Sequence, residues 1–207
     1  VWSAHSDSAV KRMEQRDSLL LSTKFSDPFW FKVNSTLDLF CKKENNMKLV
    51  DWNRKGLDEA DCDIIAAQLR RLKAPPGVRR LFLSGNQISD KGITAIAHST
   101  SFGSFPLLEN FHAQNNGIGD AGFSCLSLQI GEGHLQHLTL LDLGRNTISD
   151  DGMAFFASVL VETDGKILQS LTTLYLSSNN IRCAGATSFA SAVSSNEKIL
   201  KKLEILW

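Results

Sequence analysis

A recurring pattern of apolar residues, asparagine and glycine constrains this chain more than any other feature of its sequence. The pattern occupies residues 81–92, 141–152 and 174–185, and residues 111–122 keep it with smaller or aromatic substitutes. Its asparagine recurs at intervals of 30, 30 and 33 residues. Because one unit of this length cannot bury its own apolar face, the units are expected to stack and share a core.

Each unit combines the periodicity of a strand with that of a helix. Leu81 and Leu83 flank Phe82, which is the two-residue alternation of a strand. After the glycine that closes the pattern, Ile93 and Ile96 follow helical spacing. Loops that contain glycine or proline then lead to the next strand. Each unit is therefore predicted to form one strand, one turn and one helix.

The different spacing of strands and helices predicts the shape of the stack. Neighbouring strands lie about 4.8 Å apart, whereas packed helices need about 8–10 Å. A stack with strands on one side and helices on the other must therefore curve, with a parallel sheet on its concave side. We expect an α/β solenoid over residues 48–207, with about five repeats and the start of a sixth.

The first and last copies of the pattern are less regular than the others. The first contains Val50 and Trp52 but has Lys55 in the asparagine position. The sixth is predicted to begin with Leu200, Leu203 and Ile205. Terminal repeats have only one neighbour, so departures from the pattern are expected there.

The recurring asparagine has a structural explanation. It follows the strand where the backbone turns inward and loses its ladder partners, and a side-chain amide can supply a donor and an acceptor there. We therefore expect a structural asparagine ladder, formed by Asn86, Asn116, Asn146 and Asn179.

These residues resemble leucine-rich repeats, whose pattern is L-x-x-L-x-L-x-x-N-x-I-x-x-x-G. The unit length and the helical segment are similar to those of the ribonuclease-inhibitor-like class, and the resemblance covers residues 48–207. It implies a right-handed solenoid with a curved parallel sheet on the concave side and helices on the convex side. It also implies a fold that is used for contact with other proteins.

Residues 1–47 do not repeat and are predicted to form a separate helical extension. Residues 8–21 have helical spacing, and Asp27-Pro28 is a suitable start for a second helix through Cys41. One interpretation is an N-terminal cap that covers the exposed edge of the first repeat; the other is a docking helix for a partner. We favour the cap, because the ends of a solenoid must be covered for solubility.

The composition argues against several classes of partner. Lys plus Arg and Asp plus Glu both number 22, so the chain has no net charge that would attract nucleic acid. No apolar run approaches the roughly 18 residues of a membrane span, so no membrane insertion is expected. Because the sequence begins at Val1 without a methionine, we expect it to be part of a longer protein.

The cysteines predict a reducing compartment. The spacing of Cys41, Cys62, Cys125 and Cys183 fits neither a zinc site nor a dense disulfide framework. We interpret all four as small reduced core residues of an intracellular, cytoplasmic protein.

The sequence offers no catalytic, cofactor or metal motif that withstands inspection. Residues 117–122 read G-x-G-x-x-G, but Gly122 belongs to the repeat and no acidic residue about 20 positions further on ends a strand. His134 and His137 lie on a loop where Glu132 is the only close acid. Nucleophile elbows and triad signatures are not found. We therefore expect a protein that is not an enzyme and that needs neither cofactor nor metal.

The candidate partner-binding residues lie on the predicted concave face. Strand alternation points one residue per repeat outward, and we expect this column to consist of Asp51, Phe82, His112, Asp142, Tyr175 and Glu204. Arg54 and Arg145 occupy the adjacent turn. Aromatic and arginine side chains dominate many interfaces, whereas a solvated strand face is the ordinary alternative. Our partner-binding set is Arg54, Phe82, His112, Asp142, Arg145 and Tyr175.

Two functions from different classes fit these observations. The first is a non-catalytic interaction module or scaffold subunit that binds a protein partner, including the subunits of a larger assembly, on its concave face. The second follows from a resemblance of the repeats to Ran GTPase-activating proteins, and would make the chain an activator of GTP hydrolysis.

Overall fold

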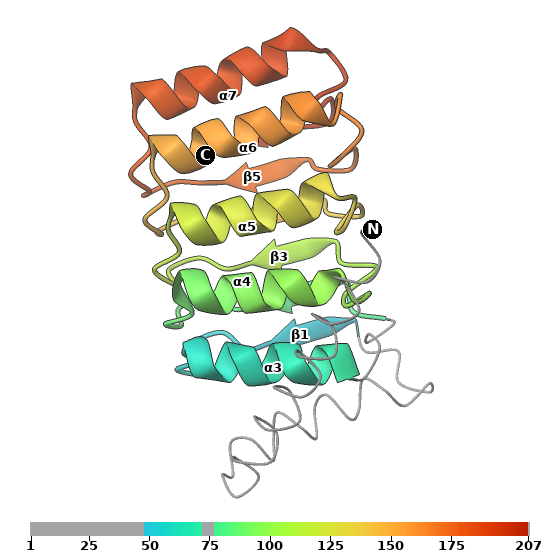
Figure 1. The fold of residues 1–207 in the computed structure, drawn as a ribbon, viewed down its shortest axis with the longest axis vertical. Coiled ribbons are helices and arrows are strands. Elements are labelled where there is room, and N and C mark those ends of the chain that lie inside the picture. Colours follow the sequence, from blue (N-terminus) through green and yellow to red (C-terminus); the bar gives the residue numbers. More distant parts are fainter. Residues whose placement is uncertain (1–47, 72–76, 207) are drawn as a thin grey trace, which may run out of the picture.

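The computed structural model describes residues 48–71 and 77–206, which form one continuous stack of repeats (Figure 1). The predicted extension at residues 1–47 lies outside this range. Strands and helices alternate along the described chain: β1 (Leu49–Asp51), α3 (Glu59–Arg71), β2 (Arg80–Phe82), α4 (Ser89–Thr100), β3 (Asn110–His112), α5 (Asp120–Gly131), β4 (Leu140–Asp142), α6 (Asp150–Glu162), β5 (Thr173–Tyr175), α7 (Cys183–Ser195) and β6 (Ile205–Leu206).

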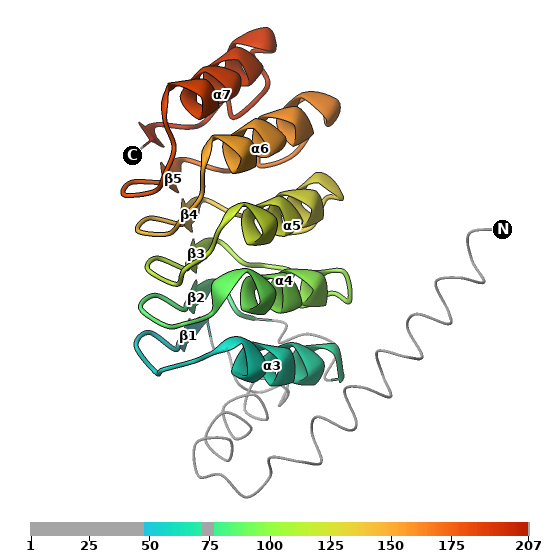
Figure 2. The same cartoon turned by 60° about the vertical axis from the view of Figure 1, so that its left-hand side comes forward.

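The strands form one parallel sheet in the order of the sequence, from β1 to β6. Every helix lies on the same side of this sheet, and the helices spread further apart than the strands (Figure 2). The stack therefore curves with the sheet on its inner side, because packed helices need more room than hydrogen-bonded strands. The α/β solenoid predicted from the sequence is confirmed.

Apolar columns that run across the repeats form the core. Every member of three columns is at most 7% exposed. The columns are Val50, Leu81, Phe111, Leu141 and Leu174 in the strands, Trp52, Leu83, Ala113, Leu143 and Leu176 after them, and Leu57, Ile88, Ile118 and Ile148 in the turns. On the helical side, the ring of Phe156 lies 5.3 Å from that of Phe123 and 6.2 Å from that of Phe189, measured between centroids. The core is thus shared between repeats, as stacking requires.

A further apolar column occupies the loops that return from helix to strand. Phe105, Leu135, Leu168 and Leu200 have φ angles of 55°, 58°, 51° and 48°, in the left-handed region that bulky residues avoid. This conformation costs roughly 1–2 kcal/mol per residue. All four side chains are buried, and burial of a large apolar side chain is worth about 1.5–3 kcal/mol, which offsets the strain.

The register assigned to the sixth repeat is wrong by three residues. In the structure Leu174 pairs with Leu206 and Thr173 pairs with Ile205, so Leu206 occupies the position that Leu203 was predicted to hold. Glu204 consequently precedes the strand and does not belong to the concave column. Leucines that recur every three residues allow both registers, and the buried left-handed Leu200 selects the later one by matching Leu168.

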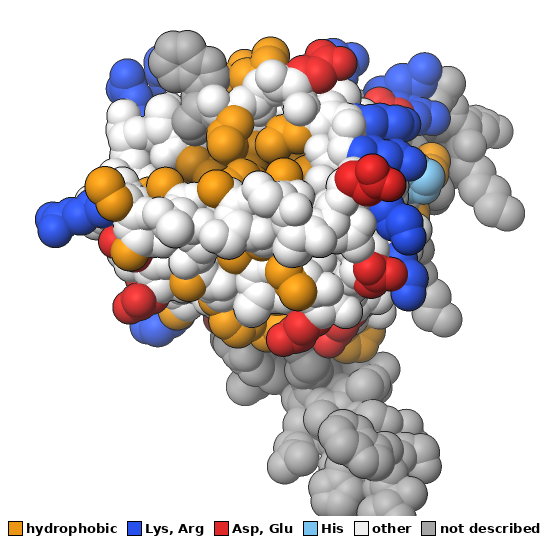
Figure 3. Space-filling model, turned by 90° about the horizontal axis from the view of Figure 1, so that it is seen from above, with side chains coloured by type: hydrophobic (Ala, Val, Ile, Leu, Met, Phe, Trp, Pro, Cys, Tyr) orange, Lys and Arg blue, Asp and Glu red, His pale blue; other side chains and the backbone are white. Residues whose placement is uncertain are grey.

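The stack ends in exposed apolar side chains. Figure 3, which views the molecule from the α7 end, shows them gathered between α7 and the sheet. Ile205 and Leu206 are 39% and 51% exposed. Leu206 continues the strand column that includes Leu174, so this column reaches the surface at the end of the described stack, whereas Ile205 faces the opposite side of the sheet.

The three cysteines of the described residues do not share one environment, and Cys41 lies outside those residues. Cys62 is buried and Cys125 is half-buried, but Cys183 is exposed at the start of α7, so its assignment to the core is wrong. Cys183 occupies the repeat position that carries aspartate at residues 90, 120 and 150, which faces the next repeat instead of the core.

No helix within residues 48–71 and 77–206 combines the length and apolar character needed to cross a membrane.

Candidate functional site on the concave face

Five of the predicted outward residues form a continuous row across the sheet. Register pairing places them side by side, one per strand from β1 to β5, and we call them the concave row: Asp51, Phe82, His112, Asp142 and Tyr175. Asp51 is exposed and the other four are half-buried. Equal repeat lengths bring side chains about 30 residues apart in sequence to neighbouring positions on one surface.

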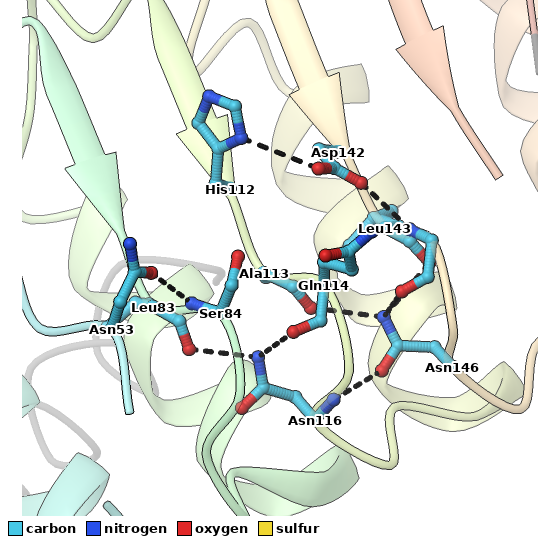
Figure 4. Close-up of polar contacts among 11 residues, drawn as sticks. Asn53, Leu83, Ser84, His112, Ala113, Gln114, Asn116, Asp142, Leu143 and Asn146 are labelled. Carbon is cyan, nitrogen blue, oxygen red and sulfur yellow. Dashed lines mark hydrogen bonds and ion pairs between the residues drawn. The ribbon is translucent and has the colours of Figure 1, made fainter. Parts of the chain in front are cut away.

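Two direct contacts link three members of the concave row. The Phe82 and His112 rings lie edge to face, with centroids 4.6 Å apart. Nδ1 of His112 lies 3.4 Å from Oδ2 of Asp142 (Figure 4). The other Asp142 oxygen accepts a hydrogen bond of 3.0 Å from the backbone N–H of Gly144. These contacts hold an aromatic ring, an imidazole and a carboxylate in fixed order.

The turns beside the concave row carry the two predicted arginines. Arg54 and Arg145 have φ angles of 52° and 53°, and Asn115 adopts the same left-handed conformation in the turn between them. Both arginines are exposed. The Arg54 side chain lies against Gly85 of the next turn, which brings its charge toward β2.

A second outward row was missed in the sequence analysis. The first residue of each strand faces the same side as the third, so these residues line the concave face as well: Leu49, Arg80, Asn110, Leu140, Thr173 and Ile205. The signal that could have found them is the two-residue period itself, extended one step toward the N-terminus of each strand. Arg80 is the only charged member of this second row.

The four asparagines link consecutive repeats. Oδ1 of Asn146 accepts hydrogen bonds from the backbone N–H groups of Asn116 and Ile118 in the preceding repeat. Its Nδ2 donates to the carbonyl groups of Ala113 and Leu143, one in each repeat (Figure 4). Asn86, Asn116 and Asn179 make related bonds. The asparagine side chains thus provide hydrogen-bond partners for the backbone groups of the turns and present no group to a ligand.

Aspartates at the start of the helices form another ladder, which the sequence analysis did not predict. Asp90 accepts hydrogen bonds from the N–H groups of Gly119 and Gly122 at the start of the next helix, at 2.6 and 3.0 Å. Asp120 and Asp150 act in the same way on the helices that follow them. Each carboxylate therefore caps the helix of the next repeat, where a negative charge is favourable.

This second ladder helps to explain the glycine that ends three of the four patterns, because Asp90, Asp120 and Asp150 lie close to Gly122, Gly152 and Gly185. Gly92 lies against Ile88 and Cys62 instead. A Cβ at Gly122 would lie 2.7 Å from Oδ1 of Asp90, which is too close for any side chain. It also accounts for the G-x-G-x-x-G segment at residues 117–122. The expectation that no acidic residue about 20 positions further on ends a strand is wrong, because Asp142 ends β4. A nucleotide site is nevertheless not formed, since the N–H groups that would hold a phosphate donate to Asp90 instead.

Two thiols outside the concave face have raised pKa values. Burial raises the pKa of the Cys62 thiol, and burial is also the main cause of the raised pKa of Cys125. Both thiols are therefore kept protonated and poorly nucleophilic. Within residues 48–71 and 77–206, no three His, Cys, Asp or Glu side chains are grouped so that they could hold a metal ion.

The geometry defines a class of protein: a curved α/β solenoid that presents one face of a parallel sheet. Comparison with protein families is more specific, because residues 78–97, 134–157 and 168–190 match the Leucine Rich repeat family model. These matches support a leucine-rich-repeat protein. The ribonuclease-inhibitor-like class stays a prediction, and the GTPase-activating alternative gains no support from the matches.

Proposed function

We propose that this protein is a non-catalytic interaction module that binds a protein partner with its concave face. The residues proposed to contact the partner are Arg54, Phe82, His112, Asp142, Arg145 and Tyr175. Leucine-rich repeats are generally used for contact with other proteins, which supports an interaction role.

The observation that carries the proposal is the contact of His112 with Phe82 on one side and with Asp142 on the other. Each side chain is held by its neighbour and stands on a hydrogen-bonded sheet, so little conformational entropy remains to be lost on binding. Phe82 and Tyr175 add aromatic surface, and Arg54 and Arg145 add the guanidinium groups that interfaces favour. A rigid face of this composition is suited to binding a folded or extended polypeptide.

The proposal is tested with a triple variant in the full 207-residue chain. Phe82→Ala, Arg145→Ala and Tyr175→Ala remove two aromatic anchors and one charge from the concave face. A matched control carries Phe102→Ala, Phe155→Ala and Lys91→Ala, which remove two exposed aromatics and one charge from the helical side. Native partners are captured on each immobilised protein and measured by quantitative mass spectrometry.

The expected result is that the control retains the partners of the wild type and the concave variant loses at least about 90% of them, which corresponds to about 1.4 kcal/mol of binding free energy. Urea unfolding of each protein establishes that the stack is intact. If the concave variant is folded and captures the same partners in the same amounts, the concave face is not the binding surface.

A further inference from the structure

We propose that the polypeptide bound on the concave face is acidic, with its carboxylates pairing with Arg54, Arg80 and Arg145 and an apolar side chain packing on Phe82. This inference rests on the proposed function and adds the chemistry of the partner. It follows from a difference in pairing: the acidic side chains of the concave row are engaged within the chain, whereas the arginines of this surface have no carboxylate partner in the described residues.

The acidic side chains of the concave face are engaged within the chain. Asp51 accepts a hydrogen bond of 3.0 Å from the N–H group of Asn53. Asp142 lies between the His112 ring and the Gly144 N–H group. Their negative charge is thus partly met by groups of the protein itself, which weakens its effect on a partner.

The three arginines differ from these acids. Arg54, Arg80 and Arg145 are exposed, and none has a carboxylate within ion-pair distance in the part of the chain that the structure describes. A guanidinium group stays charged at every physiological pH and can bind a carboxylate through two parallel hydrogen bonds. The charge that the concave face offers to a partner is therefore mainly positive.

The arginines are placed on both sides of the concave row. Arg80 lies two residues before Phe82 on β2, in the second row. Arg54 and Arg145 lie in the turns beyond the other end of the strands, and Arg54 reaches across Gly85 toward β2. A segment that crosses the strands over Phe82 would meet a cation on either flank. Apolar contact in the centre with charge pairs at the rim is the usual organisation of an interface.

Acidic polypeptide fits this surface better than nucleic acid does. The chain carries no net charge, so it lacks the long-range attraction that phosphate backbones require. Asp51 on β1 and Asp142 on β4 place negative charges in the concave row, and these would repel a polyanion that carries a charge at every step. Carboxylates spaced among apolar side chains can avoid these two positions.

The test is a selection of random 16-residue peptides displayed on phage against the immobilised full-length chain. We expect the selected peptides to contain at least about three times as much Asp plus Glu as Lys plus Arg. A fluorescent copy of the best peptide is then titrated against the variant Arg54→Asn/Arg80→Asn/Arg145→Asn. The chain itself has asparagine at the equivalent positions Asn110 and Asn115, so these substitutions suit the local backbone.

The affinity of the peptide for this variant should fall about tenfold or more, since three exposed charge pairs contribute up to roughly 1 kcal/mol each. A matched control, Lys166→Asn/Lys198→Asn/Lys201→Asn, removes the same charge from exposed residues of the return loops and should bind within about twofold of the wild type. Raising the salt concentration should weaken binding to the wild type and to the control, and have less effect on the arginine variant.

The remaining outcomes separate this inference from the proposed function. Peptides that lose binding on Phe82→Ala but are neutral or basic would overturn the acidic partner and leave the concave face as the site. Failure to select any peptide would overturn the acidic peptide and leave a folded partner as the ligand of the concave face. Peptide binding that is unaffected by both Phe82→Ala and Tyr175→Ala would overturn both the inference and the proposed function. A single-stranded RNA oligonucleotide that binds more tightly than the acidic peptide would replace the polypeptide with nucleic acid.

Discussion

The asparagine ladder and the concave row recur with the same period but differ in chemistry. One position is asparagine in four successive repeats, whereas the other is aspartate, phenylalanine, histidine, aspartate and tyrosine. Asn146 is buried and bonds to the backbone of two repeats. Phe82 is half-buried and contacts mainly another side chain.

The difference shows which positions of this stack are constrained by folding. A turn whose N–H and C=O groups are buried needs a side chain that both donates and accepts hydrogen bonds and that fits the space in the turn. Asparagine meets both requirements. The concave row leaves no backbone group unsatisfied, because the strand ladder has already paired them. Its side chains are free to differ, so the specificity of the protein can reside there.

The largest effect is expected from Asn146→Ala. The substitution leaves the N–H groups of Asn116 and Ile118 and the C=O groups of Ala113 and Leu143 without this partner. At about 1–3 kcal/mol for each unsatisfied buried group that water cannot reach, we expect a loss of at least about 3 kcal/mol in the free energy of unfolding. Urea denaturation followed by circular dichroism measures it.

Asn179→Ala is the matched comparison within the same ladder. Asn179 is half-buried and its Oδ1 accepts one hydrogen bond, from Ile148 N–H, so its loss should cost about half as much. Equal losses at Asn146 and Asn179 would show that burial does not set the energy of this column.

Gly152→Ala tests the aspartate ladder. A methyl group at residue 152 would collide with Oδ1 of Asp120, and we expect a loss of about 1–3 kcal/mol in stability. Asp120→Ala alone should cost about 1 kcal/mol by removing the hydrogen bonds to Ser149. Because the smaller side chain makes room for the methyl group, the double variant should lose less than the sum. If the stability losses of the two single variants add up to that of the double variant in urea unfolding, residues 120 and 152 are not in contact.

Phe82→Ala is expected to have a smaller effect on stability than Asn146→Ala or Gly152→Ala. The ring is half-buried and its contact with His112 is worth about 0.5–1.5 kcal/mol, so the loss should be near 1 kcal/mol. Leu81→Ala, one residue away and buried, should cost about 2–5 kcal/mol in the same assay. A loss at residue 82 as large as that at residue 81 would place Phe82 in the core and weaken its role in binding.

The smallest effect is expected at Glu59, which occupies in the first repeat the position that the aspartate ladder occupies in the later repeats. A hydrogen bond from the Ser89 hydroxyl, followed by the interaction with Lys91, lowers the pKa of this carboxyl below its usual 4.5. A lowered folded-state pKa stabilises the protein above the unfolded-state pKa, and this contribution is lost as pH falls. The melting temperature of Glu59→Gln should therefore lie slightly below that of the wild type at pH 7.

The difference between the two melting temperatures should shrink as the pH is lowered from about 5 to about 3, through the titration range of the carboxyl. Thermal unfolding at a series of pH values measures it. A difference that stays constant across this range would mean that the charge of Glu59 does not contribute.

Much of the candidate site could be predicted because its signals are local. Alternation around Phe82 shows that this side chain leaves the core, and equal repeat lengths place His112 and Asp142 beside it. Their contact could not be predicted, since side-chain conformation decides whether neighbours on a sheet touch. The aspartate ladder was missed for a related reason: Asp90 acts on a helix that begins 30 residues later, and no local pattern announces that contact.

The repeat period, the alternation within each unit and the asparagine column follow from the order of the residues, because backbone geometry allows few ways to bury such a pattern. The pairing of His112 with Asp142 and the capping of each helix by the previous repeat arise from packing between units. So does the register of β6, where Leu200, Leu203 and Leu206 fit two alignments. Contacts between units depend on loop length and on the burial of residues such as Leu200. Neither can be read from the sequence of a single repeat.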